Sequence, residues 1–376
     1  MEHHRHQAQD QAEEHAATGV PEAWSGPGVT VTDLPQAGPA GVPGWFARPA
    51  RPGPVPAVVL VHPAGGWDRR CRIPAADTLA EKDVFLFDDL AASLLRAGVG
   101  VVGFDARFIT ARRTDGWDPG RVTFPGLVQD VVALLRYLRA HPAVDEHRVT
   151  LLGVSLGTLI AVAAAAEEQR AGAGAPCRLV LAAPGAVSLD QHLAWTLVGR
   201  RLEWLLAAGL VARDGTVDLA RAAALHADRA GWWDDFTPAH FTPAEPADRP
   251  AASVSYEQVA GTLMHRHHEY TRALFSIGND DAPAEYWRSW REFPPMAETF
   301  AGLRGRVRLH VGDEDWTSAP RHSWLLAQSA PKDLEVQVTV HPDLGHLFSR
   351  RDASGRLTHG PIHPTALAAL TASVLE

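Results

Sequence analysis

The sequence has few cysteines, no long apolar run and no excess of positive charge. Its two cysteines, Cys71 and Cys177, are too few for a disulfide framework in a chain of 376 residues. No apolar stretch reaches the length of about 18 residues that is typical of a membrane-spanning helix. The formal net charge of -9 argues against broad contact with nucleic acid or with an anionic membrane surface. We therefore expect a protein that acts without nucleic acid and without a membrane.

The N-terminal segment lacks the apolar core of a signal peptide. Residues 1–25 are polar, acidic and rich in histidine, and they show no apolar period. Such a composition cannot bury enough apolar surface to fold alone, so we expect a disordered tail over 1–25. The low cysteine count and the missing leader predict a cytoplasmic protein.

Apolar strands alternate with helical stripes from residue 57 onward. The runs that predict buried strands lie at 57–61, 99–104, 149–154 and 179–182, after two short edge-strand candidates at 29–32 and 44–47. Repeated alternation of strand and helix predicts an α/β fold with a mostly parallel central sheet and helices on both faces.

This alternation breaks between residues 186 and 300 and then resumes. The segment has helical patterns and contains six of the twelve tryptophans. These aromatic side chains would suit a bulky, partly apolar substrate, or they could form a small core within the segment itself. Strand patterns return at 307–311 and 334–340, and a helix closes the chain from about 364. We expect a core over 26–185 and 301–376 with a helical cap, 186–300, inserted over the strands' carboxyl ends, where ligands bind in such sheets. A separate helical domain is the alternative.

The turn Gly153-Val154-Ser155-Leu156-Gly157 is the main candidate for chemistry. A G-x-S-x-G sequence is weak evidence alone, but here a buried strand leads into it and a helix rich in small residues follows. That setting lifts a serine hydroxyl above the sheet on a strained turn. The pattern predicts that Ser155 is a nucleophile.

A serine hydroxyl needs a base, and the base needs an acid to orient it. In chains with this kind of strand-to-helix turn, the acid follows the serine in the sequence and the histidine comes last. Each lies in a loop after a later strand. We choose Asp315 as the acid, with Asp313 and Glu314 as alternatives, and His346 as the base. His341 lies too close to a strand end for this task.

Backbone N–H groups must stabilise the oxyanion that forms when the serine attacks a carbonyl. The N–H of Leu156 is one candidate donor, because it opens the helix after Ser155. The second donor is expected in the loop after the first buried strand, where Ala64 is our choice and Gly65 the next. Pro63 has no N–H and cannot donate.

Two tryptophans are expected in the substrate pocket because of their neighbours in the sequence. Trp67 follows the oxyanion segment, and Trp316 follows Asp315. Near the cluster His265-Arg266-His267-His268, no carboxylate or second cluster stands at a sequence spacing that is typical of metal ligands. We therefore expect a solvated helix face there. We predict no metal and no cofactor.

Three segments carry a resemblance to a known family. The sequences 59–66, 104–107 and 144–149 resemble the α/β-hydrolase superfamily, and within it bacterial serine esterases with a helical cap. The resemblance implies the α/β-hydrolase fold and cleavage of an ester, thioester, amide or lactone through an acyl-serine, without a cofactor. Pro63 and Thr158 depart from the glycines that are usual at their positions.

Three functions remain open at this point. The first is a carboxylesterase or lactonase acting on a small molecule with a Ser-His-Asp triad. The second is a thioesterase or acyltransferase on CoA- or carrier-bound acyl groups, which needs a basic patch such as Arg69-Arg70 or Arg112-Arg113. The third is a ligand-binding or cyclase-like protein without an acyl-enzyme, against which the complete triad argues. The sequence predicts no oligomeric state.

Overall fold

A computed structural model of the protein describes most of the chain. The described residues are 20–34, 41–65, 67–75, 82–107, 122–172, 177–222, 253–279, 282–351 and 360–376. Most of the predicted tail, the pair Arg112-Arg113 and two of the cap tryptophans, Trp232 and Trp233, lie outside these residues.

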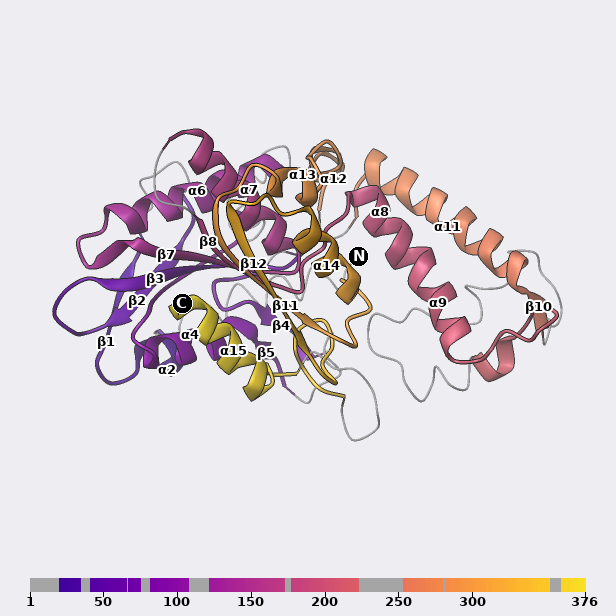
Figure 1. Cartoon of the computed structure of the whole chain (residues 1–376), viewed down its shortest axis with the longest axis horizontal. Coiled ribbons are helices and arrows are strands. Elements are labelled where there is room, and N and C mark those ends of the chain that lie inside the picture. The colour runs from indigo at the N-terminus through magenta and orange to yellow at the C-terminus, as the bar shows by residue number, and fades with distance from the viewer. Residues whose placement is uncertain are drawn as a thin grey trace, which may run out of the picture.

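Eight of the described strands form one sheet in the order β1-β2-β6-β3-β7-β8-β11-β12 (Figure 1). Their bounds are β1 Val29–Asp33, β2 Gly44–Pro49, β3 Val55–Val61, β6 Gly100–Phe104, β7 Val144–Val154, β8 Cys177–Ala182, β11 Gly305–Gly312 and β12 Leu334–His341. From β6 to β12 all neighbours are parallel, whereas β1 and β2 run antiparallel at one edge. The predicted α/β class with a mostly parallel sheet is confirmed. A short hairpin, β4 (Arg72–Ile73) and β5 (Val84–Phe85), lies outside this sheet.

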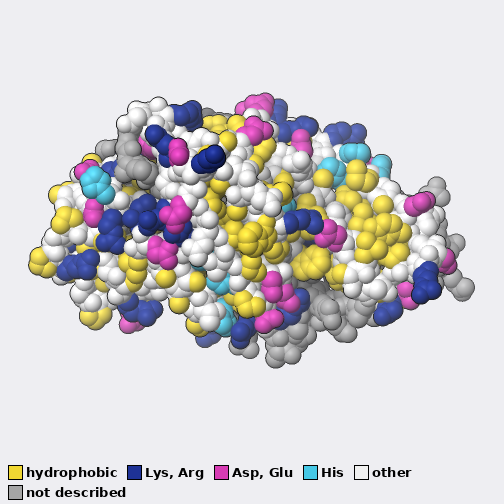
Figure 2. All heavy atoms as spheres, viewed as in Figure 1, with side chains coloured by type: hydrophobic (Ala, Val, Ile, Leu, Met, Phe, Trp, Pro, Cys, Tyr) yellow, Lys and Arg dark blue, Asp and Glu magenta, His cyan; other side chains and the backbone are white. Residues whose placement is uncertain are grey.

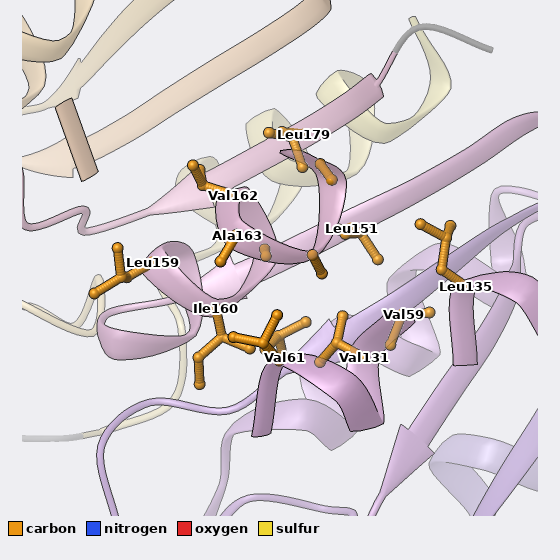
Figure 3. Packing of buried hydrophobic residues seen from close by; sticks show 14 of the residues in the cluster. Val59, Val61, Val131, Leu135, Leu151, Leu159, Ile160, Val162, Ala163 and Leu179 are labelled. Carbon is orange, nitrogen blue, oxygen red and sulfur yellow. The ribbon is translucent and has the colours of Figure 1, made fainter. Parts of the chain in front are cut away.

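Helices cover both faces of the sheet, which is why β3 and β6 are apolar along their whole length. One face carries α6 (Phe124–Ala140), α7 (Leu156–Arg170) and α14 (Pro320–Ser329), and the other carries α4 (Leu86–Arg96) and α15 (Pro364–Leu375). Side chains of β3 alternate between the two cores, as the pleat requires. Val59 and Val61 pack with Val131 and Ile160 (Figure 3), whereas Leu60 faces the core of α4 and α15.

The prediction that the disordered tail extends to residue 25 is wrong for its last six residues. Residues 20–25 include the helix α2 (Glu22–Ser25), whose Trp24 is fully buried. The Trp24 indole donates a hydrogen bond to Asp88 of α4 at 2.7 Å and lies edge-on to Trp45 of β2. A single aromatic side chain in a polar stretch therefore anchors this segment to the core, because its burial alone removes a large apolar surface from water.

The described part of the segment predicted as a cap is largely helical and departs from the sheet pattern. It contains α8 (Leu189–Ala194), the π-helix η2 (Trp195–Gly199), α9 (Arg200–Ala207), α11 (Tyr256–Ser276), α12 (Ala284–Arg291) and α13 (Met296–Phe300), with the strand pair β9 (Thr216–Asp218) and β10 (Ser253–Ser255). Figure 1 shows α8, α9 and α11 extending to one side of the sheet. Buried residues of η2, α9, β9 and α11 form a small apolar cluster of their own, and the buried residues of α8 form another with Leu274 of α11. Hydrophobic side chains also gather on the surface of this projection (Figure 2).

The insert helices return to the core where α12 packs against α6 and where α13 packs against α7 and α14. No helix in the described ranges combines the length and apolarity that crossing a membrane requires.

Candidate active site

Ser155 occupies a strained turn between β7 and α7. Its backbone has φ +52° and ψ −119°, a conformation that non-glycine residues rarely adopt and that persists only when neighbours hold it. The Ser155 N–H donates to the Ala182 carbonyl of β8 at 2.8 Å, and the Thr158 hydroxyl donates to the Ser155 carbonyl at 2.6 Å. The neighbouring strand and the first helical turn therefore fix this backbone.

The two glycines of the turn are required by close backbone packing. A Cβ on Gly153 would overlap the carbonyl of Gly157, and a Cβ on Gly157 would overlap the carbonyls of Val61 and His62 in the next strand. Any larger residue would push the turn away from the sheet.

The side chains of Ser155, His346 and Asp315 form a hydrogen-bonded relay. His346 Nε2 lies 2.9 Å from Ser155 Oγ, and His346 Nδ1 lies 2.9 and 3.0 Å from the two Asp315 oxygens. A carboxylate only accepts, so Nδ1 donates and Nε2 is left to accept the serine proton. The structure thus brings together the three side chains that the sequence placed in separate loops after β7, β11 and β12.

Backbone donors hold the Asp315 carboxylate in place. Its Oδ1 accepts hydrogen bonds from the N–H groups of Thr317 at 2.9 Å and Ser318 at 2.7 Å. The alternative acids point elsewhere: Glu314 pairs with Arg351 at 2.8 Å, and Asp313 is exposed. Asp315 is therefore the acid that reaches His346.

His310 and His341 form a buried pair inside the fold, apart from the relay. Their rings stack with centroids 5.3 Å apart, and His310 Nδ1 lies 3.0 Å from His341 Nε2. His310 Nε2 lies 3.0 Å from the Ser373 hydroxyl. Burial lowers the pKa of His310 to about 3, which keeps it neutral, and also lowers the pKa of His341.

The predicted oxyanion donors lie on two sides of Ser155. Leu156 is the first residue of α7, where N–H groups have no acceptor within the helix. Ala64 belongs to the loop after β3, and both residues line one cavity with Ser155. Gly65 lies in the same loop, with φ +120°.

Trp67 supports this loop and is not among the described residues that line the cavity. Its indole N–H donates to the Ala64 carbonyl at 2.6 Å, and its ring packs against the α-carbon of Gly65. In a trans peptide the C=O and N–H point in opposite directions, so this bond turns the Gly65 N–H away from Trp67. His62 also holds this loop, because its Nε2 lies 3.0 Å from the Asp68 carbonyl. Burial lowers the pKa of His62 to about 4.

The cavity at Ser155 has a volume of about 420 Å³ including its open mouth. It is lined by Ala64, Ser155, Leu156, Thr158, Leu159, Gly185, Val187, His192, Trp290 and Ser318. None of these described lining residues is an aspartate, glutamate, lysine or arginine. Trp290 and His192 come from the insert, and no sequence motif predicts that either lies at the site. The only sequence feature that points to them is the aromatic content of residues 186–300.

Trp316 lies outside this cavity, in a neighbouring hollow between the acid loop and the insert. That hollow also contains Trp195, Glu203 and Arg321. The Trp195 indole donates to the Trp316 carbonyl at 3.1 Å, and Arg321 lies over the Trp195 ring and pairs with Glu203. Trp316 therefore links the acid loop to η2.

No group of three or more histidine, cysteine, aspartate or glutamate side chains in the described part of the chain is arranged to hold a metal ion. In the histidine cluster of α11, His265 is exposed and lies 3.6 Å from Glu269.

Neither a protein family nor a curated protein matches the sequence. Solved structures do match. DcsB, solved in complex with its substrate analogue, has 14% identity and a TM-score of 0.50 over 92% of this chain and 98% of that one. The alpha/beta hydrolase GrgF from Penicillium sp. sh18 has 14% identity and a TM-score of 0.47, covering 85% and 91% of the two chains. Acetyl xylan esterase 1 from Thermoanaerobacterium sp. has 16% identity and a TM-score of 0.45, covering 89% and 78%.

At these identities the likeness concerns the fold alone. The strand order, the strand directions and the strand-to-helix turn at Ser155 are those of the α/β-hydrolase fold, and this is the fold of the chain.

Proposed function

We propose that the protein is a serine hydrolase that cleaves a carboxylic ester or lactone through an acyl-serine. The observation that carries the proposal is the relay from Ser155 to His346 to the buried Asp315, built on a strained turn above the sheet. Such an arrangement raises the nucleophilicity of a hydroxyl that is otherwise unreactive.

In the proposed reaction, Ser155 Oγ attacks the carbonyl carbon while its proton passes to His346 Nε2. Asp315 holds the imidazole in the required tautomer and stabilises the imidazolium that forms. The N–H groups of Leu156 and of Ala64 or Gly65 stabilise the oxyanion. The alcohol leaves with the proton from His346, and water then releases the acid by the same steps in reverse.

The cavity favours an uncharged substrate with a flat or apolar body. Its described lining lacks aspartate, glutamate, lysine and arginine side chains, and Trp290 supplies an aromatic wall. We assign residues 186–300 as a cap, because the helices α8 and α12 of this segment bring His192 and Trp290 to the site. Trp67 is proposed to hold the oxyanion loop through its bond to Ala64, and Trp316 to connect the acid loop to the cap.

Hydrolysis or transfer of CoA-bound acyl groups has less support. Such substrates need cations for their phosphates, but both arginines of the candidate pair near the site bind carboxylates. Arg69 pairs with the buried Asp105 at 2.9 Å, and Arg70 pairs with Asp88.

Labelling with a fluorophosphonate probe tests the proposal. We expect the wild-type protein to be labelled, Ser155→Ala to lose all labelling, and Ser276→Ala, which changes an exposed serine of α11, to keep it. Hydrolysis of short p-nitrophenyl esters should be lost with the same variant. An unlabelled wild type, or labelling that survives Ser155→Ala, would refute the assignment of the nucleophile.

A further inference from the structure

His192 of α8 brings an imidazole into the cavity that contains Ser155. It shares this lining with Trp290 of α12. The two helices pack through Leu189 and Leu193 of α8 against Trp287 and Trp290 of α12, and an exposed ion pair between Asp190 and Arg291 at 3.0 Å also joins them. The mechanism above gives His192 no task, although it is the one titratable side chain among the described lining residues.

The position of His346 indicates which part of the substrate occupies this cavity. The leaving alcohol must reach His346 Nε2 to take up its proton. His346 is not among the described residues that line the cavity, whereas Leu156 and Ala64, the oxyanion candidates, both are. The cavity therefore suits the acyl part, which stays attached to Ser155 after the alcohol has left.

The surroundings of His192 keep its imidazole neutral. Burial is the largest cause, and the nearby His346, His322 and Arg200 act in the same direction, against the opposing effect of Asp315. Together they lower the pKa of His192 to about 4. A neutral imidazole offers one N–H donor and one nitrogen acceptor. A hydroxyl group can satisfy both, whereas a carbonyl oxygen can only accept.

We propose that His192 is a specificity residue that recognises a hydroxyl group on the acyl part of the substrate, whose flat apolar body lies against Trp290. This inference rests on the proposed function, since it assigns the acyl side of the same site. It names the substrate class as esters of uncharged, hydroxylated acids with an aromatic or similarly flat body.

Paired substrates test the assignment. The p-nitrophenyl esters of 3-phenylpropanoic acid and of its 3-hydroxyphenyl and 4-hydroxyphenyl counterparts differ only in the hydroxyl. We expect the wild type to prefer one hydroxylated ester in kcat/KM by on the order of tenfold, as one hydrogen bond allows. His192→Phe should reduce this preference to about one, because the preferred hydroxylated ester loses more in kcat/KM than the unsubstituted ester does.

Two further variants separate recognition from folding. His192→Gln keeps a donor and an acceptor and should retain part of the preference. His265→Phe changes an exposed histidine of the same insert and should leave it unchanged. A wild type that does not prefer either hydroxylated ester would overturn the inference. So would a preference that survives His192→Phe, or an equal loss on all three esters in both His192 variants.

The two proposals can fail separately. If the wild type hydrolyses the esters but shows no preference, only the role of His192 fails. If it neither hydrolyses the esters nor reacts with the fluorophosphonate, the proposed function fails. Recognition is then measured as binding of 3-(4-hydroxyphenyl)propanamide, 3-(3-hydroxyphenyl)propanamide and 3-phenylpropanamide, followed by tryptophan fluorescence. Tighter binding of a hydroxylated amide that is lost in His192→Phe supports the role of His192, and equal binding of all three amides refutes it.

Discussion

Gly312→Ala should separate the loops that carry Asp315 and His346. Gly312 ends β11, and its α-carbon faces the carbonyls of Leu344 and Gly345 in the loop before His346. An added Cβ would lie 2.7 Å from the Gly345 oxygen and closer still to that of Leu344. Since carbon–oxygen contacts settle at about 3.3–3.6 Å, clearing the Leu344 oxygen requires the two loops to move apart by more than about 1 Å.

That displacement acts directly on the relay. The Asp315–His346 and His346–Ser155 distances are all about 3 Å, so they have no slack for such a shift. A misplacement near 1 Å can lower a rate by about a hundredfold, and overpacking also costs about 1–3 kcal/mol of stability. We expect kcat to fall by about 30- to 100-fold in a variant that still folds.

The assay combines p-nitrophenyl ester kinetics, the rate of fluorophosphonate labelling and thermal unfolding. Gly261→Ala is the matched control, because a Cβ at this position of α11 meets no atom within 4 Å. It should leave kcat unchanged and slightly raise helix stability. Wild-type kcat in folded Gly312→Ala would show that the loop spacing does not limit the reaction, and the reasoning would be wrong.

Two other changes test the acid and the buried histidine pair. Asp315→Asn should lower kcat by about 10⁴ with little change in KM, because the amide favours the wrong imidazole tautomer. Initial rates measure this, and a small loss would argue against Asp315 as the acid. The folded-state pKa of His310, about 3, lies below its ordinary value, so the stability that its neutral form contributes is complete above about pH 6.5 and is lost as the pH falls toward 3. Thermal unfolding between pH 7 and 4 should therefore show a smaller loss in His310→Gln than in the wild type, and parallel losses would exclude His310 as the cause.

The centre of the sheet could be predicted because strands such as β3 and β6 are buried on both faces. That burial requires unbroken apolar runs such as the one in β3, and these are visible without any partner. The burial of Trp24 could not be predicted in this way. Nothing in the polar sequence around it indicates burial, because the site that receives the indole is formed by α4 and β2. A single long-range contact has no local pattern.

The candidate site divides in the same way. Ser155, Asp315 and His346 were predictable because each follows a recognisable strand, and parallel strands bring their carboxyl ends to one edge of the sheet. Trp290 was not, since its position depends on contacts between the insert and α6. Phe124 stacks on Trp290 with ring centroids 5.8 Å apart, and the Phe124 N–H donates to Ser289 at 2.8 Å. Such contacts follow from the folded arrangement and from no sequence period.

The residues of the proposed chemistry and those of the proposed recognition belong to different parts of the fold. The relay is held mainly by loops of the sheet, through backbone bonds such as those from Thr317 and Ser318 to Asp315. Its one described hydrogen bond to the insert runs from Trp195 to the Trp316 carbonyl. His192 and Trp290 lie on helices of the insert that are tied to each other by Asp190 and Arg291. Because the two sets share the cavity but are held mainly by different contacts, a change at His192 or Trp290 should alter which acyl group is accepted while leaving the attack of Ser155 on a small probe intact. Hydrolysis of the unsubstituted ester and labelling by the fluorophosphonate measure the function of the relay. The preference for a hydroxylated ester measures the function of His192 and Trp290.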